Sequence, residues 1–366
     1  MRFRSGPGMV LGLLLCASAA ADPVLEPGAA RAAASGAQVD EILTRIGQAA
    51  DQGSATALVD LAGVIAARDL HPAARDRVLR ELAMALARVR PDAATRALID
   101  ELAQRPPGVR VWLREGHHRI DVLLYDVAAA ARYTSRRWTE AAARREAHAA
   151  MEIRDATLVE RFAAGDAAFR KGVVAALDGV HDDALLAFRD PVIMALRAGA
   201  DVGALALPVT LRLEDPELAA ALLLHGDATL LVHALPRIAM ALGAADALTI
   251  YESALARDDI ASAVMFEIGR LAAKDGRAVD VLFEFLDDPD VGGSAAAALA
   301  RLDDPHIALD LGRRLEGGGS GLPERRALLA LRLSDTDAAR DALDRFMRSS
   351  TASAELQHEA ALWTRP

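Results

Sequence analysis

Arginines alternate with aromatic rings between residues 130 and 146 of the chain. A guanidinium group stacks on aromatic faces and holds a carboxylate or a phosphate through two parallel hydrogen bonds. Such a cluster can bind an anionic polymer or an acidic face of a protein. The alternatives are that Tyr133 and Trp138 anchor a junction between helical layers beside solvated arginines, or that the arginines meet acidic residues elsewhere in the chain. The candidate partner-binding residues, in the cluster and just before it, are Trp112, Tyr125, Tyr133, Arg136, Arg137 and Trp138.

Two neighbouring histidines, His117 and His118, lie just before Asp121. If a helix runs through this stretch, His117 and Asp121 share one face of it. A metal site needs three or four convergent ligands that are held by further hydrogen bonds, and only a histidine and a carboxylate converge locally. These three residues are metal candidates only, and we expect no metal site. The alternative is that they are polar surface or a buried, hydrogen-bonded histidine.

The chain has none of the short motifs of a serine nucleophile, a zinc protease or a dinucleotide-binding turn. The glycine-rich stretch at residues 317–321 is not followed by the Lys and Ser or Thr of a phosphate loop. We therefore expect no catalytic residue and no cofactor. The alternative is an envelope enzyme, or a small-ligand or metal-binding receptor, whose site is assembled from distant residues in a groove of the fold.

The elements that position these side chains are indicated by aspartates that recur along the second half of the chain. The first series, spaced by 31, 29, 29 and 31 residues, is Asp215, Asp246, Asp275, Asp304 and Asp335. The second series, spaced by 32, 31 and 31 residues, is Asp227, Asp259, Asp290 and Gly321. A period near 31 that contains two helix starts is typical of stacked helix pairs. The sequence predicts an all-α fold, an α-solenoid of short antiparallel helix pairs.

Aspartate suits these positions because its carboxylate accepts hydrogen bonds from the first backbone N–H groups of a helix and favours the positive end of the helix dipole. Asp190, Asp215, Asp288 and Asp304 are each followed by proline, which costs no hydrogen bond at the first helical position. Pro208 and Pro236 instead fall inside predicted helices, where a bend is expected. Helices are expected to start near Asp155, Asp166, Asp183, Asp201, Asp215, Asp227, Asp246, Asp259, Asp275, Asp290, Asp304, Gly321, Asp335 and Ser353.

One unit of this array carries a family resemblance. Residues 287–305 read Asp-Asp-Pro-Asp-Val, then an alanine-rich stretch, then a second Asp-Asp-Pro. This pattern resembles the HEAT-like repeat in its short bacterial form, although Gly292 stands where that pattern usually has an arginine after the valine. The resemblance implies a right-handed, curved superhelix with an interaction surface, and it leaves the partner unnamed.

The N-terminal residues are typical of a secretory signal peptide over 1–21, with arginines at 2 and 4, an apolar run and three alanines ending at Ala21. We expect a periplasmic or secreted protein. Cys16, the only cysteine, follows three leucines and leaves a lipid anchor as the alternative. No later stretch reaches the ~18 uninterrupted apolar residues of a membrane helix.

The rest of the chain divides by composition and pattern. We expect a flexible linker over 22–37, an N-terminal helical region over 38–105, an aromatic and basic connecting helical segment over 106–150, and a HEAT-like array over 151–366. Pro106, Pro107 and Gly108 mark the boundary before the connecting segment. The N-terminal helices are expected near 38–51, 54–68, 72–89 and 91–104.

Charge is distributed unevenly along the chain, whose net charge is −10. Residues 155–310 hold 26 acidic and 12 basic residues, whereas residues 105–154 hold six acidic residues and ten arginines. Helix caps account for part of the acidic excess. The remainder favours a basic partner for the array and disfavours nucleic acid.

These observations predict a non-enzymatic, exported scaffold or adaptor. It would bind a protein or an envelope component through the surface of a helical-repeat array and through the segment at 109–145. The sequence does not identify the partner, the binding face or the oligomeric state.

Overall fold

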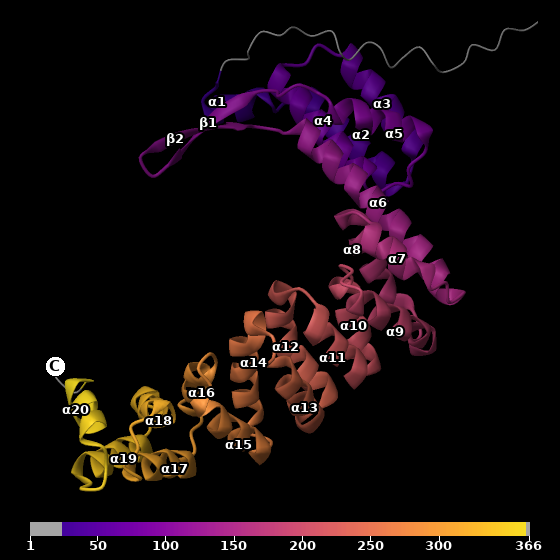
Figure 1. The fold of residues 1–366 in the computed structure, drawn as a ribbon. Helices are drawn as coiled ribbons and strands as arrows, with labels where there is room; N and C mark the ends of the chain where they lie inside the picture. Colours follow the sequence, from indigo (N-terminus) through magenta and orange to yellow (C-terminus); the bar gives the residue numbers. More distant parts are fainter. Residues whose placement is uncertain (1–23, 364–366) are drawn as a thin grey trace, which may run out of the picture. The chain divides into compact units, whose positions relative to one another are not determined.

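The computed structural model describes residues 24–363, which are mainly helical: twenty α-helices and one β-hairpin (Figure 1). No helix in this range is both long and apolar enough to cross a bilayer. The predicted signal peptide, with Cys16, lies outside the described residues. The chain forms two compact units, and the division falls inside a long helix, after Arg145. Of the described residues, unit 1 comprises those up to Arg145 together with Ala167–Gly172, and unit 2 comprises Glu146–Asp166 and those from Val173 onward.

Unit 1 is built on four helices whose positions the sequence predicted within a few residues. Their apolar faces form one core that includes Ile42, Leu58, Leu82 and Ile99. Ser54 and Asp92 accept hydrogen bonds from the first turns of the second and fourth of these helices, and Pro72 starts the third. The bounds are α2 (Ala37–Asp51), α3 (Ala55–Ala67), α4 (Pro72–Leu86) and α5 (Ala93–Ala103).

The expected flexible linker at 22–37 contains a helix, α1 (Pro27–Ala33). Glu26 caps its start by accepting a hydrogen bond from the backbone N–H of Ala29, at 3.0 Å. Ala30 and Ala34 are fully buried, and Ala34 packs with Ala73 and Val109. The linker prediction is wrong here because small alanine side chains let α1 lie close against its neighbours, a contact that local composition does not reveal.

The connecting segment was expected to be helical, but it begins with an antiparallel hairpin, β1 (Arg110–Glu115) and β2 (His118–Leu123). Apolar residues alternate along both strands, with Val111 opposite Val122 and Leu113 opposite Ile120, as a strand requires. Gly116 has φ of 60° in the two-residue loop, a conformation that glycine adopts without strain. Leu25 forms a parallel bridge to Val111 at the base. In Figure 1 the hairpin extends away from the helices of unit 1.

Helix α6 (Val127–Glu152) follows the hairpin. Asp126 caps it through the backbone N–H of Ala129, at 2.7 Å. Its buried residues over 127–138 recur at helical spacing: Val127, Ala130, Ala131, Thr134 and Trp138. This stripe fixes which face of α6 is turned outward.

Most helices of unit 2 begin within three residues of a predicted start. Asp215, Asp227, Asp275 and Asp304 are N-caps whose side chains accept from backbone N–H groups of the first turn. The bounds are α7 (Thr157–Ala164), α8 (Ala167–Ala176), α9 (Asp182–Arg197), α10 (Gly203–Leu213), α11 (Pro216–His225), α12 (Ala228–Leu242), α13 (Ala244–Ala254), α14 (Asp258–Leu271), α15 (Gly276–Glu284), α16 (Gly292–Leu299), α17 (Pro305–Glu316), α18 (Leu322–Leu333), α19 (Asp337–Arg348) and α20 (Ala354–Trp363), with 3₁₀ turns at Leu177–Gly179 and Phe285–Asp287.

Prolines inside helices meet the expectation at two positions and correct it at a third. Pro208 lies inside α10 and Pro236 inside α12, as the spacing predicted. Pro191 was expected to start a helix, yet it lies inside α9. Phe188 before it and Val192 after it are both buried, so packing on both sides of the proline keeps the helix continuous despite one lost hydrogen bond.

The helices of unit 2 pack mostly in sequence. From α10 to α18, each even-numbered helix packs on the next even-numbered helix and, except for α16 with α17, on its chain neighbours. Among the odd-numbered helices, α7 packs on α9, α9 on α11, α11 on α13, and α17 on α19. Each helix therefore buries its apolar face mainly against near neighbours along the chain.

Candidate binding surface and its pocket

One face of the hairpin carries most of its polar and aromatic side chains. The register places Trp112 opposite Asp121, Arg114 opposite Arg119, and Arg110 opposite Leu123, so these residues share a face. The Arg119 guanidinium lies 4.6 Å from the centre of the Trp112 ring, a cation–π distance. Arg110 donates to the backbone oxygen of Asp121 at 3.1 Å. We call Arg110, Trp112, Arg114 and Arg119 the hairpin basic face.

The metal candidates do not converge. His117 lies in the loop, and His118 and Asp121 are three residues apart on β2, which places them on opposite faces of the strand. The shared helical face expected for His117 and Asp121 does not exist because the segment is a hairpin. All three side chains are exposed. Within residues 24–363 no group of three or more His, Cys, Asp or Glu is placed to hold a metal ion.

Helix α6 presents a second basic surface. Arg132, Tyr133, Arg136 and Arg137 are all exposed, with Tyr133 at 40%. Arg137 donates to Glu140 at 2.9 Å, and Glu140 also pairs with Lys171 at 3.1 Å. Arg132 and Arg136 make no ion pair with any other residue that the structure describes. We call these four residues the α6 basic face.

Trp138, predicted to bind a partner, is placed in the core of unit 1. Its side chain is 6% exposed, and its indole N–H is shared between the backbone oxygens of Leu86 and Val89, each at 3.1 Å. One turn earlier, the Thr134 hydroxyl donates to the backbone oxygen of Ala83 at 2.6 Å. Trp138 therefore anchors α6 to the end of α4, and it is not part of the α6 basic face.

Tyr125 lines a pocket of about 250 Å³ in unit 1. The turn at residues 106–108, the end of β2 and the first turn of α6 form its walls, and Arg105 and Arg132 also line it. Asp76 lies at its base, 2% exposed, where it accepts from the backbone N–H of Val109 at 3.0 Å and pairs with Arg105 at 3.3 Å. The Asp76 carboxylate thus fixes the turn against α4.

Sequence reasoning missed Asp76 and Arg105. The available signal was a single carboxylate within the otherwise apolar face of a helix, because Ala73, Ala74 and Val78 around it are buried. A charged group in such a place is seldom fully buried unless it is paired. Its partners come from a turn about thirty residues later, which no local pattern indicates.

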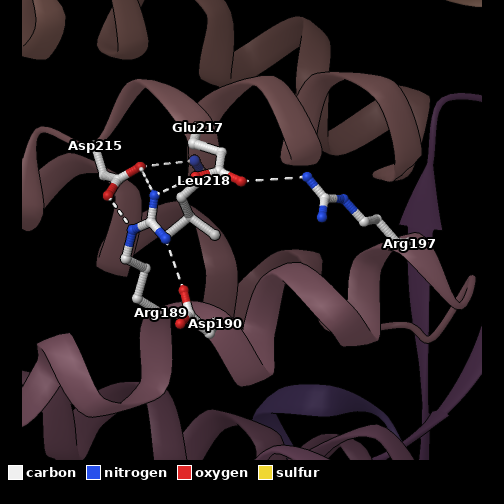
Figure 2. Close-up of polar contacts among 6 residues, drawn as sticks. All are labelled: Arg189, Asp190, Arg197, Asp215, Glu217 and Leu218. Atoms are coloured by element: carbon white, nitrogen blue, oxygen red, sulfur yellow. Dashed lines mark hydrogen bonds and ion pairs between the residues drawn. The ribbon is translucent and has the colours of Figure 1, made fainter.

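In unit 2 a network of polar contacts surrounds Arg189 (Figure 2). Its guanidinium bonds to Asp215 at 2.5 Å, to Glu217 at 2.5 Å and to Asp190 at 2.6 Å, while Arg197 reaches Glu217 at 3.3 Å. Asp215 also accepts from the backbone N–H of Leu218 at 2.8 Å. These carboxylates raise the pKa of Arg189 far above its usual value. The network holds α9 to the start of α11.

Acid should weaken this network. Burial acts to raise the pKa of Asp215, but hydrogen bonds from Arg189 and from the Leu218 backbone outweigh it and keep the pKa below its usual range. The Asp215 carboxylate therefore stabilises unit 2 above its unfolded-state pKa of ~3.9, and this contribution is lost as the pH falls through the lower folded-state value.

We expect Asp215→Asn to lower the free energy of unfolding by about 1–2 kcal/mol at pH 7, and by less near pH 3, which lies below the pKa of the carboxyl in the unfolded chain. Urea unfolding followed by circular dichroism at both pH values measures the difference. Asp190→Asn is the matched control, because its side chain is 79% exposed, and we expect it to change the free energy by under about 0.5 kcal/mol. A loss for Asp215→Asn that is equal at both pH values would contradict this assignment.

Comparison of the chain with known protein families and with curated proteins found no match.

Proposed function

We propose that the protein is an exported, non-enzymatic scaffold that binds a protein or an envelope component. The observation that carries the proposal is the exposure of arginines beside aromatic rings, the half-buried Trp112 and the exposed Tyr133, on two elements of unit 1 that are fixed to its core. The hairpin basic face is tied to α1 through Leu25, and the α6 basic face is held by Trp138. Exposed cations beside aromatic rings on a fixed backbone suit the binding of an acidic protein surface.

We also propose that unit 2 is a right-handed HEAT-like α-solenoid, and the arrangement of its helices supports this. Helix starts at a period near 31, and packing of each even-numbered helix on the next one from α10 to α18, are typical of stacked helix pairs. Repeat arrays of this kind offer long surfaces to partners. Met194 and Met240 are 64% and 78% exposed, and methionine adapts readily to a partner's shape. Part of the acidic charge of this unit caps helices, and the rest favours a basic region of a partner.

Export is proposed on the sequence of residues 1–21, which are typical of a cleaved signal peptide. A periplasmic or secreted location makes nucleic acid an unsuitable partner for the arginines. We propose that the partner of unit 1 is an acidic protein.

The test is a triple variant in which Tyr133, Arg136 and Arg137 become alanine, with Arg90→Ala/Arg96→Ala as the control. Both control arginines are exposed in unit 1 and pair with no acidic residue within residues 24–363. Each protein is tagged, expressed in its own cells, cross-linked in the intact envelope and purified. We expect roughly tenfold less captured partner for the triple variant, with wild-type yield for the control and unchanged circular dichroism for both. Equal capture by all three proteins would remove the α6 basic face from the proposal.

A further inference from the structure

We infer that the unit 1 pocket receives a carboxylate group from an acidic segment of the partner protein; this inference rests on the proposed function and names the chemistry that one part of the surface recognises. The pocket joins the two basic faces. Leu123, which lines it, shares the face of the hairpin that carries Arg110 and Trp112. Arg132, which also lines it, begins the α6 basic face. A peptide that crosses both faces must therefore pass over the pocket.

The pocket has guanidinium N–H groups that its own carboxylates do not use. Its two carboxylates are already occupied: Asp76 by Arg105 and the Val109 backbone, and Asp126 by the Ala129 backbone. Arg132 has no ion-pair partner among the described residues, and Arg105 uses only one of its nitrogens on Asp76. Two guanidinium groups can therefore donate to an incoming anion, and an arginine suits a carboxylate in a two-bond geometry. The phenol of Tyr125 adds another polar group to the wall.

The size of the pocket favours a side chain over a whole ligand. Small-molecule and cofactor sites usually measure about 300–1,000 Å³, and this pocket holds about 250 Å³. A glutamate or aspartate side chain fits such a volume. Neighbouring carboxylates of the same segment would then meet Arg114 and Arg119 on one side and Arg136 on the other.

The test measures binding of a fluorescein-labelled hexaglutamate peptide to the full chain by fluorescence anisotropy, with hexaglutamine as the uncharged peptide. Arg132→Gln removes the donor, and Ala128→Met fills the pocket without changing any charge, because Ala128 lines it. Arg96→Gln is the charge-matched control. We expect hexaglutamate alone to bind, Arg132→Gln and Ala128→Met each to weaken it by about tenfold or more, and the control to stay within about twofold, since a distant exposed charge acts weakly through screening solvent.

Three other outcomes would overturn the inference, each for a different reason. If Arg136→Ala/Arg137→Ala weakens hexaglutamate binding while both pocket variants bind like wild type, the pocket is excluded and the proposed function stands. If hexaglutamate does not bind, or hexaglutamine binds equally well, carboxylate recognition is excluded, and the envelope capture experiment decides the proposed function separately. If free glutarate displaces the peptide at equal concentration, the pocket is a site for a small acid and not for a peptide segment.

Discussion

Trp138→Ala is expected to lower the free energy of unfolding of unit 1 by about 3–5 kcal/mol, the usual cost of deleting a large buried aromatic side chain. The ring is 6% exposed, and it packs in the core that α2–α5 share with α6. Its loss also removes the indole donor from the backbone oxygens of Leu86 and Val89, of which Leu86 keeps a hydrogen bond from the Val89 backbone N–H. Leu86 ends α4 and Val89 follows it, in the region where helix carbonyls lack an α-helical partner.

Hydrogen exchange measured by mass spectrometry on peptides from α4 and α6 reports this loss locally. Tyr133→Ala is the matched control, because this aromatic residue on the same helix is 40% exposed, and we expect wild-type protection. Trp138→Phe separates the two causes: it retains most of the packing and should cost about 1–2 kcal/mol for the lost hydrogen bonds. If Trp138→Ala left exchange in α4 unchanged, Trp138 would not be the anchor of α6, and its predicted role in partner binding would again be open.

Arg326→Met is expected to destabilise unit 2 by about 2–4 kcal/mol, because several backbone oxygens lose a charged donor at once. The Arg326 guanidinium, which comes from α18, donates to the backbone oxygens of Leu286, Asp288 and Pro289, the first at 3.0 Å and the last at 2.9 Å. It thereby holds the turn between α15 and α16 against a helix some forty residues later. Arg332→Met, on the exposed side of the same helix and without an ion pair in the described range, is the control.

Gly292→Ala tests the same contact from the other side. A Cβ at this position would lie 2.2 Å from a terminal nitrogen of Arg326 and 2.6 Å from the backbone oxygen of Phe285, so either the guanidinium or the turn must move. Faster hydrogen exchange over residues 285–300 in both Gly292→Ala and Arg326→Met, with no change in Arg332→Met, is the expected pattern. Wild-type exchange in Arg326→Met would show that the turn is held by other contacts.

Gly292 also shows how a local sequence pattern can miss a tertiary contact. The pattern usually has an arginine at this place, whereas here the space beside residue 292 is filled by an arginine from α18. The local pattern shows that no arginine stands at position 292, but it does not show that Arg326 fills the space. The sequence could therefore predict where α16 lies without predicting what stabilises the turn before it.

Helix starts were predictable because their cause is local. Asp215 and Asp304 accept hydrogen bonds from N–H groups two or three residues away, so sequence spacing alone reports them. Asp246 and Asp259 are not N-caps, because the N-cap positions of α13 and α14 are occupied by Gly243 and Arg257. Both aspartates nevertheless lie in the first turn of their helices. Their carboxylates favour the positive end of the helix dipole, and the predicted starts stayed within three residues of the observed ones.

The hairpin and the orientation of α6 were not predicted. Val111, Leu113, Ile120 and Val122 alternate over only two short strands, and the segment was interpreted as helical from its neighbours. On α6 the composition showed arginines and aromatic rings but not which face is buried; the spacing of Ala130, Thr134 and Trp138 carries that information. The pocket depends on Asp76 and on a turn about thirty residues away, and only tertiary structure brings them together.

We propose that this protein works by binding another protein. Native mass spectrometry of the chain purified gently from its own cell envelope, followed by denaturing mass measurement of the same sample, tests this proposal. We expect an adduct of protein size that disappears on denaturation and is reduced when Tyr133, Arg136 and Arg137 are replaced by alanine. A chain that carries only a metal ion or a small molecule, with no protein adduct, would contradict it.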